Sequence, residues 1–455
     1  MKRAWAFQGF HEDLWRFVGH AVQHMIASAE AESKAAAQSG EGKGRAFLQE
    51  MMAMIGSVLV VIIAATASVT VFLGGALTLG SLLLAQVLKR LWCRLRTVCP
   101  NMHCAHRISL PEHRCDGEYE GAPCRQWEEN LAPSTYGLFR RPCVRCERSL
   151  PTLDVMGRAR LRRRCPECGT TVSEESWGTV RAVFLTLVGP KSAGKSHLAI
   201  AVTEYLRDLA QRRSDITLKF TGTEGSKTLA RFQAERDVVY VHRRVLDPTP
   251  FQEPWSITTL ITTPSGRLEL TIQDAAGEIF TNVDEITGSP FIRHSDVLLV
   301  IVPVSCLPAV GGADVVSSTD CARTCEAAIT YTERVGGYRV DQRLPIRAAM
   351  VLAHADLPQV KIALARKSPH GNTPTPATPE LLESMILEDT EMSNALHLLR
   401  ARFRSVRVSL VSALGVAPRP DGSLPNDVPL DPWGVGELLD WALSEVGAVK
   451  PSELR

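Results

Sequence analysis

The sequence has no marked excess of either charge, few aromatic residues and no internal repeat. Lys and Arg number 51 against 49 Asp and Glu, a formal net charge of +2, and aromatic residues make up 6% of the chain. This balance gives no overall attraction to nucleic acid or to acidic partners. Hydrophobic residues at 45% and charged residues at 22% are near globular averages, which argues against a disordered chain and against a polytopic membrane protein. A length of 455 residues suggests two or three domains.

One long stretch lacks charge altogether. From Met51 to Val87 there is no Asp, Glu, Lys or Arg, and this run exceeds the roughly 20 residues that a transmembrane helix needs. We therefore expect a transmembrane segment over residues 51–90. Gly74 and Gly75 divide the run, so it forms either one span or a helical hairpin, and we favour the hairpin. The segment is followed by four basic residues, Lys89, Arg90, Arg94 and Arg96.

The basic residues after the apolar run predict the orientation of the chain. By the positive-inside rule they remain in the cytosol, so the predicted location is the cell membrane, with lipid as a partner and the later domains cytoplasmic. Residues 1–50 are predicted to form an amphipathic helix that ends near Ala29, followed by a linker from Ala31 to Gly44. The helix either packs on the rest of the protein or lies on the bilayer surface.

Cysteine is scarce outside one region. Nine of the twelve cysteines lie between Cys93 and Cys168, and the region 91–175 contains two CxxC motifs. Such clustering indicates metal ligands in a reducing compartment. The two motifs are 18 residues apart and predict one tetrahedral Zn²⁺ with a structural role, held by Cys143, Cys146, Cys165 and Cys168.

Other thiols and imidazoles precede these motifs. A second zinc site is an open alternative, with ligands from Cys99, Cys104, Cys115 and Cys124 and from His103, His106 and His113. The region shows no aromatic interleaving, which argues against nucleic-acid binding. We expect this zinc-ribbon region to bind a protein partner instead.

Residues 180–450 alternate apolar runs with helical segments. This alternation predicts an α/β domain with a mostly parallel sheet. The expected strands are 183–188, 257–261, 268–272, 297–304, 348–352 and 406–411.

A glycine-rich loop follows the first of these strands. It matches GxxxxGK[ST] and comprises Gly189, Pro190, Lys191, Ser192, Ala193, Gly194, Lys195 and Ser196. Between a strand and a helix, such a loop wraps phosphates with its backbone N–H groups. Lys195 is expected to contact the β and γ oxygens, and Ser196 to bind Mg²⁺.

A DxxG motif ends the strand 268–272, and a predicted strand hairpin precedes it. Asp274 is expected to hold Mg²⁺, and Gly277 to sense the γ-phosphate. Glu278 either orients the attacking water or is a solvated residue. Thr249 is the best placed switch threonine, with Thr221 and Thr223 as competitors. Arg231 and Arg243 lie in the segment before the hairpin, but neither is assigned as an arginine finger.

Two later strand ends are expected to recognise the base. Asp356 follows strand 348–352, at the position where Ras-like GTPases carry [NT]KxD, and it is the only motif residue retained. Ser412 and Ala413 follow strand 406–411 and resemble the last GTPase element. We expect Asp356 to pair with the guanine edge and a backbone amide near Ala413 to contact the guanine oxygen.

The ordered motif series resembles the TRAFAC class of P-loop GTPases. The DAAGE form of the second motif, together with the Cys-rich region, resembles the bacterial double-GTPase family of conflict systems. The resemblance covers roughly residues 180–450 and implies a Ras-like P-loop fold that binds GTP with Mg²⁺. The sequence departs from it in the reduced [NT]KxD motif and in Glu278, where Gln is usual. The predicted function is a membrane-anchored GTPase switch; an ATPase of the same superfamily and a non-hydrolysing nucleotide-binding adaptor remain alternatives.

Overall fold

The computed structural model divides the chain into two compact units. The first contains Met1–Trp92 and Leu110–Arg163, and the second contains Cys93–Ser109 and Arg164–Arg455. The structure describes residues 8–38, 43–99, 101, 104, 106–134, 137, 139–172, 180–220, 227–247, 255–274, 290–310, 316–339, 342–367, 378–451 and 453–454.

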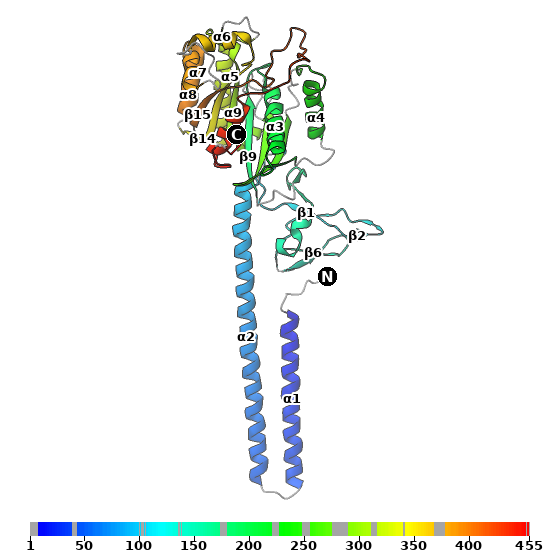
Figure 1. Ribbon diagram of the computed structural model, residues 1–455. Helices are drawn as coiled ribbons and strands as arrows, with labels where there is room; N and C mark the ends of the chain where they lie inside the picture. Colours follow the sequence, from blue (N-terminus) through cyan, green and yellow to red (C-terminus); the bar gives the residue numbers. More distant parts are fainter. Residues whose placement is uncertain are drawn as a thin grey trace. The chain divides into compact units, whose positions relative to one another are not determined.

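Two long helices begin the first unit: α1 (Gln8–Gln38) and α2 (Lys43–Arg96) (Figure 1). Helix α2 continues without a break through Gly74 and Gly75, so the favoured hairpin is wrong. Each glycine costs a helix about 1 kcal/mol relative to alanine, which the surrounding run of strong helix formers outweighs. The predicted linker from Ala31 is also mostly helical, because its Ala, Glu, Lys and Gln residues favour a helix.

Small residues mediate the contact between α1 and α2. Val18 of α1 is buried, as are Ala64 and Ser68 of α2. A Cβ atom on Gly56 would lie 2.6 Å from Cε of Met25, so the absence of a side chain at Gly56 lets the helices approach closely. The amphipathic character of α1 is therefore used, at least along this stretch, to pack on α2.

One helix among the described residues is long and apolar enough to cross a membrane. The segment Glu50–Thr70 of α2 has a mean hydropathy of 2.4, and 12% of it is buried. At 1.5 Å per residue, a helix as long as α2 extends about 80 Å, well beyond the roughly 30 Å hydrocarbon core of a bilayer. A single crossing therefore accounts for only part of α2.

Short strands and 3₁₀ turns make up the Cys-rich region. In the first unit β1 pairs with β4, β2 with β3 and β5 with β6, all antiparallel. The elements are β1 (Glu112–Arg114), β2 (Glu118–Tyr119), β3 (Ala122–Pro123), β4 (Trp127–Glu128), β5 (Arg140–Pro142), β6 (Ser149–Pro151), η1 (Asp154–Met156), η2 (Arg158–Arg160), β7 (Arg163–Arg164) and β8 (Thr171–Val172). Such short strands bury little apolar surface, so another source of stability is needed.

A seven-stranded sheet forms the centre of the second unit. Its order is β10-β11-β12-β9-β13-β14-β15. The β10–β11 and β11–β12 pairs are antiparallel, and all other pairs are parallel. The strands are β9 (Arg181–Val188), β10 (Thr217–Phe220), β11 (Trp255–Thr263), β12 (Gly266–Asp274), β13 (Val297–Pro303), β14 (Leu344–Ala353) and β15 (Phe403–Leu410).

Helices cover both faces of this sheet (Figure 1). Alternate residues of the central strands enter opposite cores: in β13, Leu298 and Val300 face one core, whereas Leu299 and Ile301 face the other. The first core includes α5 (Ser318–Gly336), α6 (Pro358–Lys367), α7 (Pro379–Ile386), α8 (Thr390–Arg402) and η5 (Pro290–His294). The second includes α3 (Lys195–Arg212), α4 (Lys227–Tyr240) and α9 (Val435–Glu445).

The sheet confirms the α/β class and all six strands expected from apolar runs. Strand β10 was missed because its four residues alternate between exposed and half-buried positions at the sheet edge. The five parallel strands β12, β9, β13, β14 and β15 end on the same side. The loops that follow them therefore meet at one end of the sheet, which is where ligands bind in open parallel sheets.

Candidate functional site

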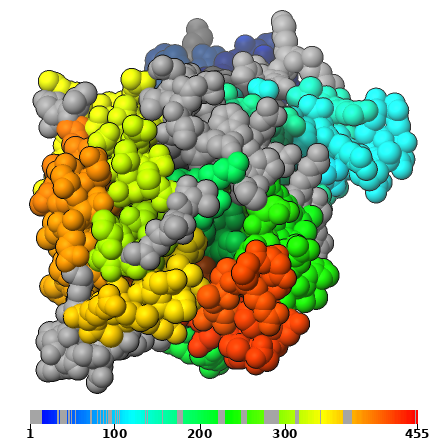
Figure 2. All heavy atoms as spheres, turned by 90° about the horizontal axis from the view of Figure 1, so that it is seen from above, coloured from blue at the N-terminus to red at the C-terminus, as the bar shows by residue number. Residues whose placement is uncertain are grey.

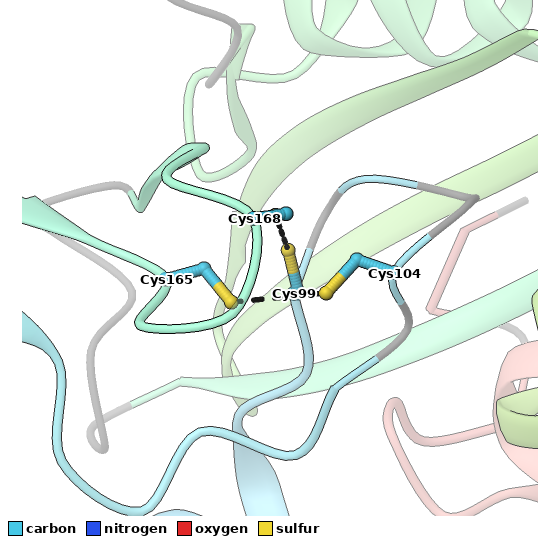
Figure 3. A group of neighbouring side chains, drawn as sticks. All are labelled: Cys99, Cys104, Cys165 and Cys168. Carbon is cyan, nitrogen blue, oxygen red and sulfur yellow. Dashed lines mark hydrogen bonds between the residues drawn. The ribbon is translucent and has the colours of Figure 1, made fainter.

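Eight cysteines of the chain form two separate clusters of four. Within each cluster all sulfur atoms lie within 4.8 Å of one another. Cluster A belongs to the second unit and comprises Cys99, Cys104, Cys165 and Cys168. Cluster B belongs to the first unit and comprises Cys115, Cys124, Cys143 and Cys146. Figure 3 shows the side chains of cluster A turned toward a common centre.

The sulfur spacing of both clusters fits a tetrahedral metal. With a Zn–S bond of about 2.3 Å, the edge of a tetrahedron is about 3.8 Å. The sulfurs of Cys99 and Cys168 are 3.5 Å apart, and those of Cys104 and Cys165 are 3.8 Å apart. In cluster B the corresponding distances are 3.5 Å and 3.9 Å. These separations are far longer than the roughly 2.05 Å of a disulfide, so each cluster is suited to Zn²⁺.

The CxxC motifs of both clusters are held by the same backbone turn. The N–H of Cys143 donates to Arg148 O, and the N–H of Glu147 donates to Cys143 O. In the second motif, Cys165 and Gly169 make the equivalent bonds, to Thr170 O and to Cys165 O. Glu147 and Gly169 both adopt positive φ, 56° and 72°. The turn aims both thiols of each motif at one point.

The sequence-based grouping of these cysteines is wrong. Cys143 and Cys165 lie in different clusters, so the two CxxC motifs do not share one metal ion. Each motif is instead completed by two upstream cysteines, and cluster B is nested in the chain between the two halves of cluster A. His106 and His113 are in neither cluster; His103 lies outside the described residues. The pairing escaped prediction because equal CxxC spacing does not reveal which upstream thiols fold back onto each motif.

Burial opposes ionisation of several thiols in both clusters, although hydrogen bonds to other groups lower the pKa of Cys146 and Cys168. Burial raises the pKa of Cys99, and its neighbours Cys165 and Cys168 raise it further. Burial raises the pKa of Cys104 to about 11 and that of Cys143 to about 11. A bound Zn²⁺ supplies the positive charge that lets such thiols ionise. Four sulfurs leave no open coordination position, so the role available to each metal is structural.

A second candidate site lies between β9 and α3, where the loop Gly189–Ser196 connects them. Ser192 and Gly194 have positive φ, 62° and 88°. This alternation makes a concave array of backbone N–H groups, the geometry that binds anions. The N-cap of α3 is Gly194, which makes no side-chain cap hydrogen bond, and a helix N-terminus of this kind favours an anion.

Two glycines of this loop are required by close approaches. A Cβ atom on Gly189 would lie 2.5 Å from Ile301 O in β13. A Cβ atom on Gly194 would lie 3.1 Å from Nε2 of His354, and the φ of Gly194 disfavours any other residue. The loop is thus fixed against the ends of β13 and β14.

The functional side chains of the loop converge on the end of β12. Lys195 is buried, and its Nζ donates to Gly189 O at 3.0 Å and Pro190 O at 2.8 Å. Ser196 Oγ donates to Asp274 Oδ2 at 2.5 Å. Burial raises the pKa of Asp274 to about 6, against the opposing charge of Lys195. Asp274 Oδ1 is buried and has no hydrogen-bond partner within the described part of the chain, which fits a cation ligand.

Part of the predicted site lies outside the described residues. This holds for Gly277 and Glu278 of the DxxG motif, for Thr249, and for its competitors Thr221 and Thr223. The antiparallel β11–β12 hairpin expected before the DxxG motif is present, with Trp255 opposite Asp274 in the register.

A cavity of ≈ 130 Å³ joins this loop to the two later strand ends. Its lining includes Gly194 and His197 from the loop and α3, Asp356 from the segment after β14, and Ala413 after β15. Three segments that the sequence singled out therefore meet at one pocket. The remaining wall is formed by Leu198, Val245, Ala353, His354, Leu357, Val411, Leu414 and Pro418.

Asp356 is held in place by the other predicted base-recognition segment. Ser412 Oγ donates to Asp356 Oδ1 at 2.7 Å, and the N–H of Gly415 donates to Ser412 Oγ at 2.8 Å. The N–H of Ala355 donates to Val411 O at 3.2 Å and ties the two segments together. Ser412 thereby orients the carboxylate, a role that the sequence did not suggest.

Two histidines of the pocket were also missed. His197 Nε2 accepts from the N–H of Leu246 at 3.1 Å, and burial, with the neighbouring His354, lowers the pKa of His197 to about 4. The segment after α4, which contributes Leu246, is covered in turn by the chain after β15. Arg244 and Ser423 form an isolated β-bridge there. In Figure 2 the orange-red residues of the chain after β15 lie beside the green residues around α4. A lone histidine after GKS carries no sequence signal for such a contact.

The chain was also compared with known proteins. No protein-family model matches it, and no curated protein matches its sequence.

Proposed function

We propose that this protein is a membrane-anchored nucleotide hydrolase that uses GTP with Mg²⁺, and that its two cysteine clusters hold structural zinc. The observation that carries the proposal is the shared pocket: Gly194, Asp356 and Ala413 come from three distant segments and line one cavity. Chance motif matches would have no reason to converge in this way.

The phosphate end of the site supports the proposal. The positive-φ backbone at Ser192 and Gly194 and the uncapped start of α3 suit a polyphosphate. The Nζ of Lys195 lies at the loop, on the carbonyl oxygens of Gly189 and Pro190, where it could contact a phosphate bound there. Ser196 and Asp274 would hold Mg²⁺, which neutralises charge on the phosphates.

The base end favours guanine. A carboxylate pairs with two adjacent N–H donors on the guanine edge, whereas adenine offers no such pair. Asp356 is fixed by Ser412 before any base arrives, so little ordering is required on binding. A mismatched base would leave this carboxylate unsatisfied, at a cost on the order of 2–4 kcal/mol.

Titration of the detergent-solubilised protein with labelled GTP and ATP at fixed Mg²⁺ tests this assignment. GTP should bind more tightly, and Asp356→Ala should remove most of the difference. Lys195→Ala should weaken both nucleotides alike, and Asp427→Ala, at an exposed acid, is the matched control. Equal affinities in the unmutated protein, or a preference for ATP, would favour an ATPase. Tight binding without turnover would favour a nucleotide-binding adaptor, whose zinc modules engage a protein partner.

Membrane anchoring is a separate part of the proposal. It rests on the apolar segment Glu50–Thr70 and on the basic cluster that starts at Lys89. The protein should resist alkaline carbonate extraction, and a C-terminal tag should be protected from protease added outside intact cells. Release into the soluble fraction would exclude a spanning helix, and cleavage of the tag would reverse the orientation.

A further inference from the structure

Helix α4 packs against the strand that faces Asp274. The ring of Phe232 in α4 lies 6.0 Å from the ring of Trp255 in β11. Trp255 is the direct cross-strand partner of Asp274 in the β11–β12 hairpin, so both side chains lie on the same face of the sheet. One turn of α4 is thereby fixed beside the proposed cation site. Glu235 lies three residues beyond Phe232 and so on the same side of this helix.

Three buried polar atoms in this neighbourhood lack a partner among the described residues. They are Oδ1 of Asp274, Oε2 of Glu235 and Nε1 of Trp255. Native proteins rarely leave such atoms unsatisfied, and each one left unsatisfied costs about 1–3 kcal/mol. Two acceptors and one donor in one place are the complement of a hydrated cation bound to phosphate.

The other oxygen of Glu235 is already held. Arg231 Nε donates to Glu235 Oε1 at 2.8 Å, across one turn of α4. The guanidinium fixes the orientation of the carboxylate and leaves Oε2 for a ligand. The charge of Glu235 also opposes the ionisation of Asp274, although burial is the larger cause of its raised pKa. Two carboxylates within electrostatic reach favour a cation near both.

We infer that Glu235 is a further cation-positioning residue, which binds the water shell of the divalent ion held by Ser196 and Asp274. The inference rests on the proposed function, since the ion is the one that accompanies the nucleotide. Mg²⁺ retains several of its waters in proteins, and a carboxylate that accepts from those waters fixes the octahedron without direct coordination. Trp255 Nε1 can donate to an oxygen of the same assembly. None of the sequence motifs, from the GxxxxGKS loop to Ser412 and Ala413, includes a residue of α4.

Mg²⁺ titration of the full-length, detergent-solubilised protein with a fluorescent GTP analogue tests the inference. Glu235→Gln should raise the Mg²⁺ concentration for half-maximal binding by about 10- to 100-fold, as expected for an outer-shell ligand. Asp237→Asn removes an exposed carboxylate of the same helix and should change it less than about twofold. Glu235→Asp, which keeps the charge, should fall between the two. Thermal unfolding of each variant verifies that the fold is intact.

A second readout separates this inference from the proposed function. Mn²⁺ bound without nucleotide, measured by electron paramagnetic resonance, should bind Glu235→Gln more weakly than the unmutated protein. If Glu235→Gln matches the unmutated protein in both titrations, the inference is wrong and the proposed function stands. If the unmutated protein binds no nucleotide, the proposed function fails. The Mn²⁺ measurement alone then tests the role of Glu235. Equal Mn²⁺ affinities of Glu235→Gln and the unmutated protein would show that Glu235 does not position the cation.

Discussion

The cysteine clusters and the loop Gly189–Ser196 both bury polar groups, but they are built in different ways. In cluster A, four sulfurs already stand at tetrahedral distances, as the 3.8 Å between Cys104 and Cys165 illustrates. In the loop, by contrast, Lys195 turns onto the carbonyls of Gly189 and Pro190. Segments far apart in the chain set the first geometry, whereas contacts within a few residues hold the lysine of the loop.

This difference separates a structural ligand from an exchangeable one. Each cluster gathers four sulfurs within 4.8 Å of one another, so their metal is expected to be part of the fold. In the loop, Lys195 donates a hydrogen bond to Pro190 O and Ser196 donates one to Asp274. The loop can therefore keep its structure when its ligand leaves. Removing the metal should therefore damage stability, and removing the loop lysine should damage only binding.

The largest effect is expected in the clusters. The purified protein should contain two zinc ions, and Cys165→Ser should leave one, with loss of several kcal/mol of stability in the region around cluster A. Cys306→Ser, a change at a cysteine outside both clusters, should keep both ions. Metal analysis and proteolysis measure these outcomes.

The double variant distinguishes nested clusters from a single site. Cys143→Ser and Cys165→Ser should each remove a different zinc, so combining them should remove both. If the combination removes no more zinc than either change alone, the two CxxC motifs share one metal and the assignment of two clusters is incorrect.

An intermediate effect is expected in the loop. Lys195→Ala should change the stability of the nucleotide-free protein by less than about 1 kcal/mol, since the cost of desolvating the buried cation opposes what its contacts contribute. GTP with Mg²⁺ at about 100 times its dissociation constant should stabilise the unmutated protein by about 2.7 kcal/mol and the variant by much less. Chemical denaturation with and without nucleotide measures both. A large loss of stability in nucleotide-free Lys195→Ala would show that the loop, like the clusters, depends on this residue for its fold.

The smallest effect concerns pH. The pKa of His197 is lowered to about 4 in the folded protein. Between about pH 4 and about pH 6.5, His197 is therefore protonated in the unfolded chain but neutral in the folded protein. Stability should therefore fall as pH drops through this window, by on the order of 1 kcal/mol at pH 5. His197→Gln should lose this share of the pH dependence, as measured by urea midpoints at pH 7 and pH 5. An unchanged difference between the two midpoints would assign it to other groups.

Sequence patterns predicted what depends on short segments. The apolar runs located β9 and β13, and the GxxxxGKS spacing located the loop, because burial and backbone geometry act within a few residues there. The patterns failed where distant segments choose partners. Nothing near Cys143 indicates that it joins Cys115 and Cys124, and nothing in α4 indicates that Glu235 comes within electrostatic reach of Asp274.

The nesting of the clusters makes the intervening segment a removable cassette. The chain leaves at Ser109 and returns at Arg164, and the sulfurs of Cys104 and Cys165 hold the two connections close together. Within the cassette, the N–H of Arg114 donates to Arg162 O at 2.9 Å, so its own ends also meet. A segment whose ends already meet can be exchanged for a short loop with little entropic penalty. Cluster A thus joins the two ends of the cassette, so that insertions could lengthen, shorten or replace the cassette while the α/β domain remained unaltered.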